Sequence, residues 1–175
     1  VTVSLVLSFL NGQAADAPAT FPEQPLKAAL AQAKEQDKLI VAEFWTYHAA
    51  PSHSYAEKAL SEPAVRTWLG QYATGCRINF NFNRSLRKRF HVTETPTVLL
   101  LDTKLQVWAK LEGALPPEKV VEEMEKGRRI REAFLEAQKA VTDNPQDAAA
   151  HLALTRGYIQ MGTPESAEKA LREFH

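Results

Sequence analysis

The segment IVAEFWTYHAAPS, residues 40–52, joins an apolar strand to the start of a helix and decides the fold. Residues 39–45 form a mostly apolar run of strand length, which is typical of a central strand covered on both faces. A helix is expected to begin near Pro51 or Ser52, because proline suits the first turn of a helix. The chain is therefore expected to pass from a buried strand almost directly into a helix.

The sequence on either side of this segment alternates helices with strands. Apolar residues at helical spacing predict a helix from Leu26 to near Asp37. Further elements are predicted as follows: continuation of the helix after residue 51 past Pro63, a strand at 76–80, a short helix at 85–90, strands at 97–101 and 105–109 joined by a turn at 102–104, and a helix from Glu118. Alternation that ends in a hairpin indicates an α/β fold with a mixed sheet and helices on both faces.

From residue 26 to residue 127 the chain resembles the thioredoxin fold, in particular exported thioredoxin-like proteins. The residues that carry the resemblance are the strand 40–45 with the segment after it, SEPAV at 61–65, FHVTETPT at 90–97, and Gly113. Their order and spacing match the family. The resemblance implies a thioredoxin-like domain at 26–127.

The family's redox motif has no cysteine in this chain. Members of the family carry Trp-Cys-x-x-Cys after the central strand, with the attacking thiolate at the start of the following helix. Here the tryptophan position is His48, the nucleophile position is Ala49 and the resolving position is Ser52. Alanine cannot ionise and serine cannot form a disulfide, so the resemblance implies no catalytic residue at this site.

Peptide binding does not need those cysteines. Thr95-Pro96 resembles the family's cis-proline turn, which leaves a backbone edge open to an extended peptide. A purely structural role for this turn fits the sequence equally well. The predicted binding residues are Tyr47, His48, Ala49, Ala50, Pro51, Ser52, Thr95 and Pro96.

Glu43 occupies the place where related proteins carry a buried acid that assists the resolving thiol. We expect it to be buried, to have a raised pKa, and to form a hydrogen bond with Ser52 or with a buried water. Cys76 starts a predicted core strand, where a lone cysteine usually packs as a small apolar side chain.

Two further groups of residues have a functional and a plain interpretation. His48, His53 and Glu57 could form a metal site, but their spacing matches no metal motif, so we expect a solvated helix start, no metal and no cofactor. Arg84, Arg87, Lys88 and Arg89 form a basic cluster. Such a cluster is usually a solvated face, although this one could attract an acidic partner.

Composition excludes several classes of protein. Among the 175 residues, Lys plus Arg number 21, Asp plus Glu number 21, and there is one cysteine. Balanced charge argues against a dedicated nucleic-acid binder. A single cysteine excludes an internal disulfide and a zinc site built on several thiolates.

The two ends of the chain have distinct patterns. VTVSLVLSFL at 1–10 with the small residues up to Ala17 is typical of a signal peptide at 1–17, followed by a linker at 18–25, and is too short for a stable membrane span; a strand at Val3 to Leu10 is the alternative. Residues 128–175 resemble tetratricopeptide repeats, in which Gly162 would end a helix. A plain helical hairpin capping the domain is the alternative interpretation.

Together these features predict an exported, periplasmic or secreted, redox-inactive thioredoxin-like protein that binds a protein or an extended peptide. The alternative is a thiol–disulfide oxidoreductase whose cysteines are replaced by Ala49 and Ser52 in this chain. A third interpretation makes the domain a spacer within a larger repeat protein.

Overall fold

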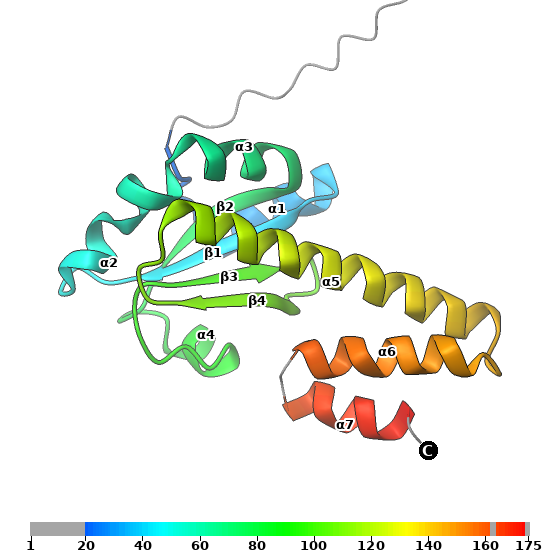
Figure 1. Cartoon of the computed structure of the whole chain (residues 1–175). Coiled ribbons are helices and arrows are strands. Elements are labelled where there is room, and N and C mark those ends of the chain that lie inside the picture. The colour runs from blue at the N-terminus through cyan, green and yellow to red at the C-terminus, as the bar shows by residue number, and fades with distance from the viewer. Residues whose placement is uncertain (1–19, 162–163, 174–175) are drawn as a thin grey trace, which may run out of the picture.

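The computed structural model describes residues 20–161 and 164–173 (Figure 1). The predicted signal peptide at 1–17, the first residues of the linker and Gly162 lie outside this part of the chain. None of the helices in the described ranges combines the length and the apolar character that crossing a bilayer requires.

The elements alternate as the sequence predicts. In chain order they are α1 (Leu26–Gln36), β1 (Leu39–Trp45), α2 (Ala50–Tyr55), a π-helical turn η1 (Ala56–Leu60), α3 (Pro63–Tyr72), β2 (Ala73–Asn79), α4 (Arg84–Arg89), β3 (Thr97–Leu101), β4 (Val107–Glu112), α5 (Pro117–Asp143), α6 (Ala148–Met161) and α7 (Pro164–Glu173). The predicted α/β class is confirmed.

The strands form one mixed sheet in the order β2-β1-β3-β4. β1 pairs in parallel with β2 and antiparallel with β3, and β3 pairs antiparallel with β4. Because β1 lies inside the sheet with helices above and below, all seven of its residues except the last are buried. This burial explains why its sequence is almost continuously apolar.

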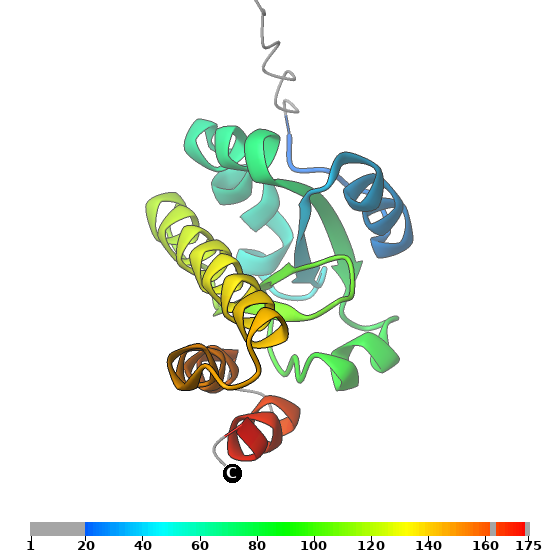
Figure 2. The same cartoon turned by 90° about the vertical axis from the view of Figure 1, so that its right-hand side faces the viewer.

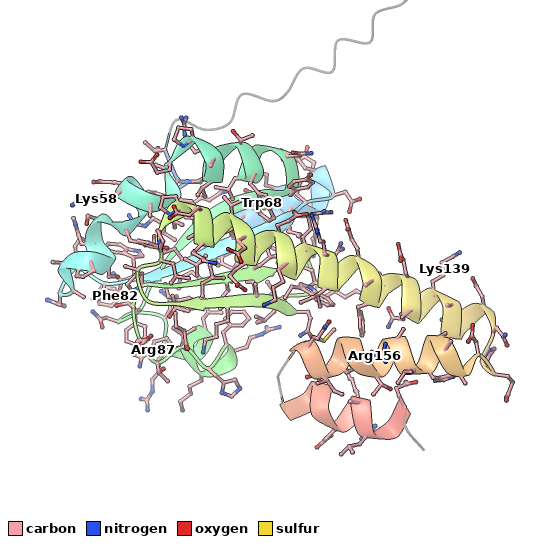
Figure 3. All side chains as sticks on the ribbon, viewed as in Figure 1. Lys58, Trp68, Phe82, Arg87, Lys139 and Arg156 are labelled. Carbon is pink, nitrogen blue, oxygen red and sulfur yellow. The ribbon has the colours of Figure 1, made fainter. Side chains whose placement is uncertain are left out.

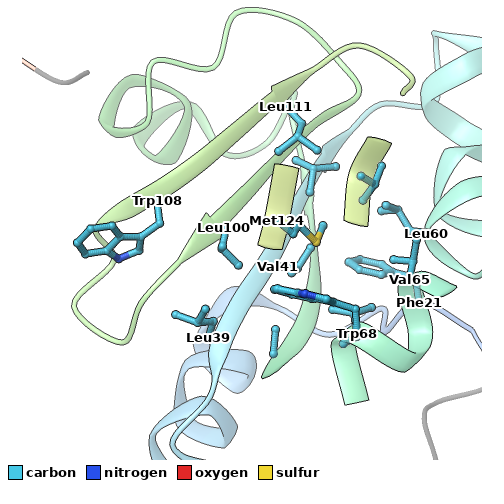
Figure 4. Close-up of a cluster of buried hydrophobic side chains, with 14 of the residues drawn as sticks. Phe21, Leu39, Val41, Leu60, Val65, Trp68, Leu100, Trp108, Leu111 and Met124 are labelled. Atoms are coloured by element: carbon cyan, nitrogen blue, oxygen red, sulfur yellow. The ribbon is translucent and has the colours of Figure 1, made fainter. Parts of the chain in front are cut away.

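Helices cover the two faces of the sheet, each over its own core. Figure 2 shows α1 and α4 on one face and α3 and α5 on the other. Side chains of β1 alternate between the faces: Val41 joins the core under α3 and α5, which Figure 4 shows, whereas Ile40 and Phe44 join the core under α1.

Several element boundaries differ from the prediction, most clearly in β2, in β4 and at Pro63. β2 begins at Ala73 rather than at residue 76. β4 begins at Val107 rather than at 105, because Leu105 has a positive φ of 61° and the Asp102 carboxylate accepts hydrogen bonds from two turn amides. The helix does not continue past Pro63: a new helix starts there, since proline has no N–H to continue the ladder.

The last helix of the sheet domain runs on into the C-terminal extension. α5 is continuous over 27 residues, so Gly127, the expected end of the domain, lies inside it. A Cβ at Gly127 would come within 2.9 Å of the Ala109 Cβ and of the Trp108 carbonyl oxygen. Gly127 is therefore the point where α5 crosses the sheet closely, and not a break between helices.

α6 folds back beside the second half of α5, and α7 packs on α6 (Figure 1). A Cβ at Gly157 of α6 would lie 2.6 Å from the Phe134 Cδ2 of α5, so this contact also needs glycine. Asp147 caps α6 by accepting hydrogen bonds from the amides of Ala149 and Ala150 at 2.9 and 3.1 Å. The extension is thus packed on α5 through α6.

Candidate functional site

The predicted site begins where β1 ends. Ala49 is the residue that precedes the first turn of α2, and Ser52 lies in that turn. Ser52 is fully buried, and its Oγ accepts a hydrogen bond from the Thr46 amide at 3.0 Å. The hydroxyl therefore holds the loop that follows β1 against α2. With alanine at the other position, neither residue presents a nucleophile to solvent.

The sheet brings the two predicted parts of the site to the same end of its strands. Phe44, near the end of β1, pairs with Thr97 at the start of β3, so the loop after β1 and the turn before β3 leave the sheet side by side. The Thr95–Pro96 peptide bond is cis, and the Pro96 carbonyl accepts a hydrogen bond from the Gly113 amide at 2.9 Å. Of the predicted binding residues, Tyr47, His48, Ala50 and Pro51 are exposed, Ala49 and Thr95 are half-buried, and Ser52 and Pro96 are buried.

Two side-chain hydrogen bonds fix the loops around this end of the sheet. Asn81 Nδ2 donates to the Thr46 Oγ1 at 3.0 Å and ties the loop after β2 to the loop after β1. The Tyr55 hydroxyl of α2 donates to the Leu115 carbonyl at 2.8 Å and ties α2 to the loop after β4. Burial raises the pKa of Tyr55 to about 12, so this hydroxyl stays protonated at neutral pH.

An aromatic cluster, defined here as Trp45, Tyr47 and His53, covers the surface next to Ala49. The Tyr47 ring lies 4.4 Å from the Trp45 ring and 5.4 Å from the His53 ring, measured between centroids. Tyr47 is 63% exposed. Phe82, at 85% exposure, projects from the loop after β2 at the same end of the molecule (Figure 3). Large exposed apolar side chains gathered in this way are typical of a binding surface.

Glu43 is buried as predicted, but it does not bond to Ser52, one of its two expected partners. Its Oε2 accepts a hydrogen bond from the Arg77 Nε at 2.6 Å, whereas Ser52 bonds to Thr46. Burial raises the pKa of Glu43 to about 7, against the opposing effect of the Arg77 charge. Arg77 also pairs with Glu23 at 2.5 Å and stacks 4.3 Å above the Trp45 ring.

The Arg77 contact was missed by sequence reasoning, although a signal for it was present. An arginine in the middle of an apolar strand and a glutamate in the middle of its neighbour suggest a pair. In the parallel register of β1 and β2, Glu43 stands opposite Arg77. Phe82 and the ring contacts of His53 carried no such signal, because they depend on how the loops fold back.

The remaining candidates behave as ordinary structural residues. Cys76 is fully buried, and burial raises the pKa of its thiol to about 12, so it is not poised as a thiolate. Within residues 20–161 and 164–173, no group of three His, Cys, Asp or Glu side chains is arranged to hold a metal ion, and His48, His53 and Glu57 do not converge. In the basic cluster, Arg87 stacks 3.6 Å from the Phe80 ring.

Comparison with known proteins identifies the fold. No protein-family model matches the chain, and a search of curated proteins also gave no match. Among solved structures, a thioredoxin from Thermus thermophilus matches with a TM-score of 0.55 and 21% identity, over 61% of this chain and 86% of that one. A protein described as DsbH oxidoreductase matches with a TM-score of 0.52 and 18% identity, over 62% and 88% of the two chains.

A third structure, a putative disulphide-isomerase from Bacteroides thetaiotaomicron, has a TM-score of 0.53 and 22% identity and is matched over 96% of its length by 63% of this chain. At such identities the likeness shows a shared fold and nothing about activity. The mixed sheet and its flanking helices are thus a thioredoxin-like fold, followed in this chain by a C-terminal helical region.

Proposed function

We propose that this protein is a redox-inactive member of the thioredoxin fold that binds extended segments of other proteins at the edge formed by the loop after β1 and the Thr95–Pro96 turn. One observation carries the proposal. The two positions that the resemblance assigns to thiols hold Ala49 and a buried Ser52 whose hydroxyl is bonded to the backbone of Thr46. The position of the reactive pair is thus filled by structural contacts.

The surroundings of that position support binding. Thr95 is half-buried beside the loop after β1, where an extended chain could lie along the backbone of the Thr95–Pro96 turn. The exposed ring of Tyr47 adds an apolar contact, and aromatic side chains contribute strongly to protein interfaces. The fixed loops mean that little ordering is needed on binding.

Insulin reduction by dithiothreitol tests the absence of redox activity. The unmodified chain should give the rate of a control without protein. An Ala49→Cys, Ser52→Cys double variant, checked for unchanged circular dichroism, shows whether the scaffold supports the chemistry once thiols are restored. Turnover by the unmodified chain would overturn the proposal in favour of an oxidoreductase.

A peptide array tests binding at the loop after β1 and the Thr95–Pro96 turn, called here the loop end. Peptides retained by the unmodified chain should be lost, with affinities reduced about tenfold, when Tyr47 is replaced by alanine. Ile159→Ala is the matched control, because Ile159 is an apolar side chain of similar exposure, 64%, on α6. Equal retention by both variants, or no retained peptide at all, would count against this site.

Export and the repeat-like extension belong to the same proposal. The apolar run at 1–10 and the small residues after it support secretion with cleavage after Ala14 or Ala17. Mass spectrometry of the mature protein should find one of these new N-termini in the exported fraction. A mature chain that retains residues 1–14 would contradict this part.

The helical hairpin of α6 and α7, packed on α5, is compatible with a single tetratricopeptide-like unit.

A further inference from the structure

A groove lies at the opposite end of the sheet from the loop after β1. It is a groove of about 460 Å³ between the β3–β4 turn, the end of α4 and the helices α5 to α7, called here the hairpin–helix groove. In Figure 1 the β3–β4 turn points toward α6 and α7, away from α2. The groove joins the thioredoxin-like sheet to the helical extension and shares no lining residue with the predicted site.

The floor of the groove is aromatic and fixed. Trp108, Phe134 and Tyr158 follow one another across it, with ring centroids 5.5 and 5.0 Å apart. The Trp108 Nε1 donates to the Asp102 Oδ2 at 3.2 Å, and Phe134 is held between β4 and the close contact at Gly157. Because these rings are anchored from several sides, the floor is preformed for an apolar side chain.

Basic side chains surround this floor. Arg89 comes from the end of α4, Lys104 from the β3–β4 turn and Lys169 from α7, and all three are exposed. Lys169 Nζ lies 5.8 Å from the Tyr158 ring. Among the described side chains, neither Arg89 nor Lys104 has an ion-pair partner.

Only one carboxylate lines the groove, against three cations, and it forms no ion pair with them. Asp102 accepts hydrogen bonds from the amides of Lys104 and Gln106 at 2.8 and 2.9 Å and from the Trp108 indole. Its oxygens are therefore used to build the turn. In a protein whose formal net charge is zero, this leaves a local excess of positive charge above an apolar floor.

We propose that the hairpin–helix groove binds a segment of a partner protein in which an apolar side chain is flanked by carboxylates. The apolar side chain would rest on the half-buried ring of Tyr158, behind which Trp108 and Phe134 are buried, and the carboxylates would pair with Arg89 and Lys104. A volume of about 460 Å³ suits a few side chains rather than a folded domain. This site is independent of the one proposed at the loop after β1.

Fluorescence anisotropy with a labelled peptide, Glu-Asp-Phe-Asp-Glu, tests the groove in the full chain. The peptide should bind, and its affinity should fall as salt is added, because charge attraction is screened. The counterpart Lys-Arg-Phe-Arg-Lys should not bind. An Arg89→Glu, Lys104→Glu double variant should weaken binding of the acidic peptide by about tenfold or more.

A matched double variant separates local from overall charge. Lys34→Glu, Lys58→Glu makes the same change in net charge on exposed residues of α1 and η1, away from the groove (Figure 3 labels Lys58), and should bind like the unmodified chain. Tyr47→Ala should also bind normally, which separates this proposal from the proposed function. Absence of saturable binding, or equal loss of binding in both double variants, would overturn the proposal that the groove binds a partner segment. Sedimentation showing that a second copy of the chain occupies the groove would overturn it as well.

Discussion

The two ends of the sheet differ in where their charged groups are used. Between β1 and β2, Arg77 pairs with both Glu43 and Glu23 and stacks on Trp45. At the β3–β4 turn, Arg89 and Lys104 have no ion-pair partner among the described side chains, although they border an aromatic floor. At the first end the charged side chains are thus paired within the protein, whereas at the second end they are available to pair with a ligand. Binding at the first end should depend little on salt, and binding at the second should depend on it strongly.

Replacing Glu43 with glutamine is expected to have the largest effect, at the loop end. The pKa of this carboxyl in the folded chain, about 7, exceeds its ordinary value of 4.5, so the folded state binds more protons between these values. Its contribution to stability is therefore greatest below pH 4.5, falls as the pH rises to about 7, and then levels off. The unmodified chain should therefore lose on the order of 3 kcal/mol of its free energy of unfolding over this pH interval. The glutamine variant should not, because glutamine does not titrate.

Urea unfolding at several pH values measures this difference. The stability of Glu43→Gln relative to the unmodified chain should rise between pH 4.5 and about 7, the interval set by the two pKa values. Glu57→Gln, on an exposed residue of η1, should show no such trend. Parallel curves for all three proteins would mean that Glu43 titrates normally.

Gly157→Leu should disrupt the groove end while sparing the loop end. The new side chain would start 2.6 Å from the Phe134 Cδ2, so α6 must move away from α5 at a cost of about 2 kcal/mol. Hydrogen exchange should accelerate in α6 and α7 but not in β1. Ala153→Leu, at an exposed position of the same helix, is the control. Unchanged exchange in α6 would show that Phe134 yields without cost.

Ser52→Ala tests the hydrogen bond that holds the loop after β1 against α2. Without the Ser52 hydroxyl, the Thr46 amide loses its acceptor at 3.0 Å in a buried setting, which should cost about 1 kcal/mol. Chemical denaturation gives the loss, and the amide of Thr46 should exchange faster. Ser54→Ala removes a longer contact of 3.4 Å on the same helix and should cost less. A larger loss at Ser54 would reverse the assignment.

The smallest effect concerns the docking of α7 on α6. His151 Nδ1 lies 2.6 Å from the Glu173 Oε2, and this contact and the Pro145 carbonyl raise the pKa of His151. The contribution of this pair is present below the ordinary histidine pKa of 6.5 and is lost as the pH rises through the raised value. Amide exchange in α7 should therefore quicken at alkaline pH, and Glu173→Gln should remove the trend. A trend that survives this substitution would assign it to another group.

How much could be predicted from the sequence depended on whether a feature is local. The ranges 39–45 and 97–101 coincide with β1 and β3, because continuous apolar runs mark buried strands. The Arg77 partner of Glu43 needed the register between strands, which periodicity does not contain. Gly127 ends the predicted domain, yet it lies inside α5, where close packing on Ala109 requires a residue without a Cβ.

The hairpin–helix groove could not be predicted from the sequence. Arg89, Lys104 and Lys169 belong to three elements that are distant in the sequence and meet only when α5 carries the extension back over the β3–β4 turn. The basic residues of α4 were visible as a cluster, with an acidic partner as one interpretation. Only the placement of Arg89 beside an aromatic floor gives that interpretation a site.

The uninterrupted α5 fixes the distance between the sheet and the helical extension. A helix of 27 residues spans roughly 40 Å at 1.5 Å per residue. It crosses the sheet without slack at Gly127, so the extension cannot hinge there without losing that contact. Two motifs of one partner that reached both sites would have to be separated by a linker that covers the part of α5 from Pro117 to Phe134, roughly 26 Å at 1.5 Å per residue. Such a partner would gain avidity from tethering only above a threshold linker length, and shortening its linker would abolish the gain abruptly.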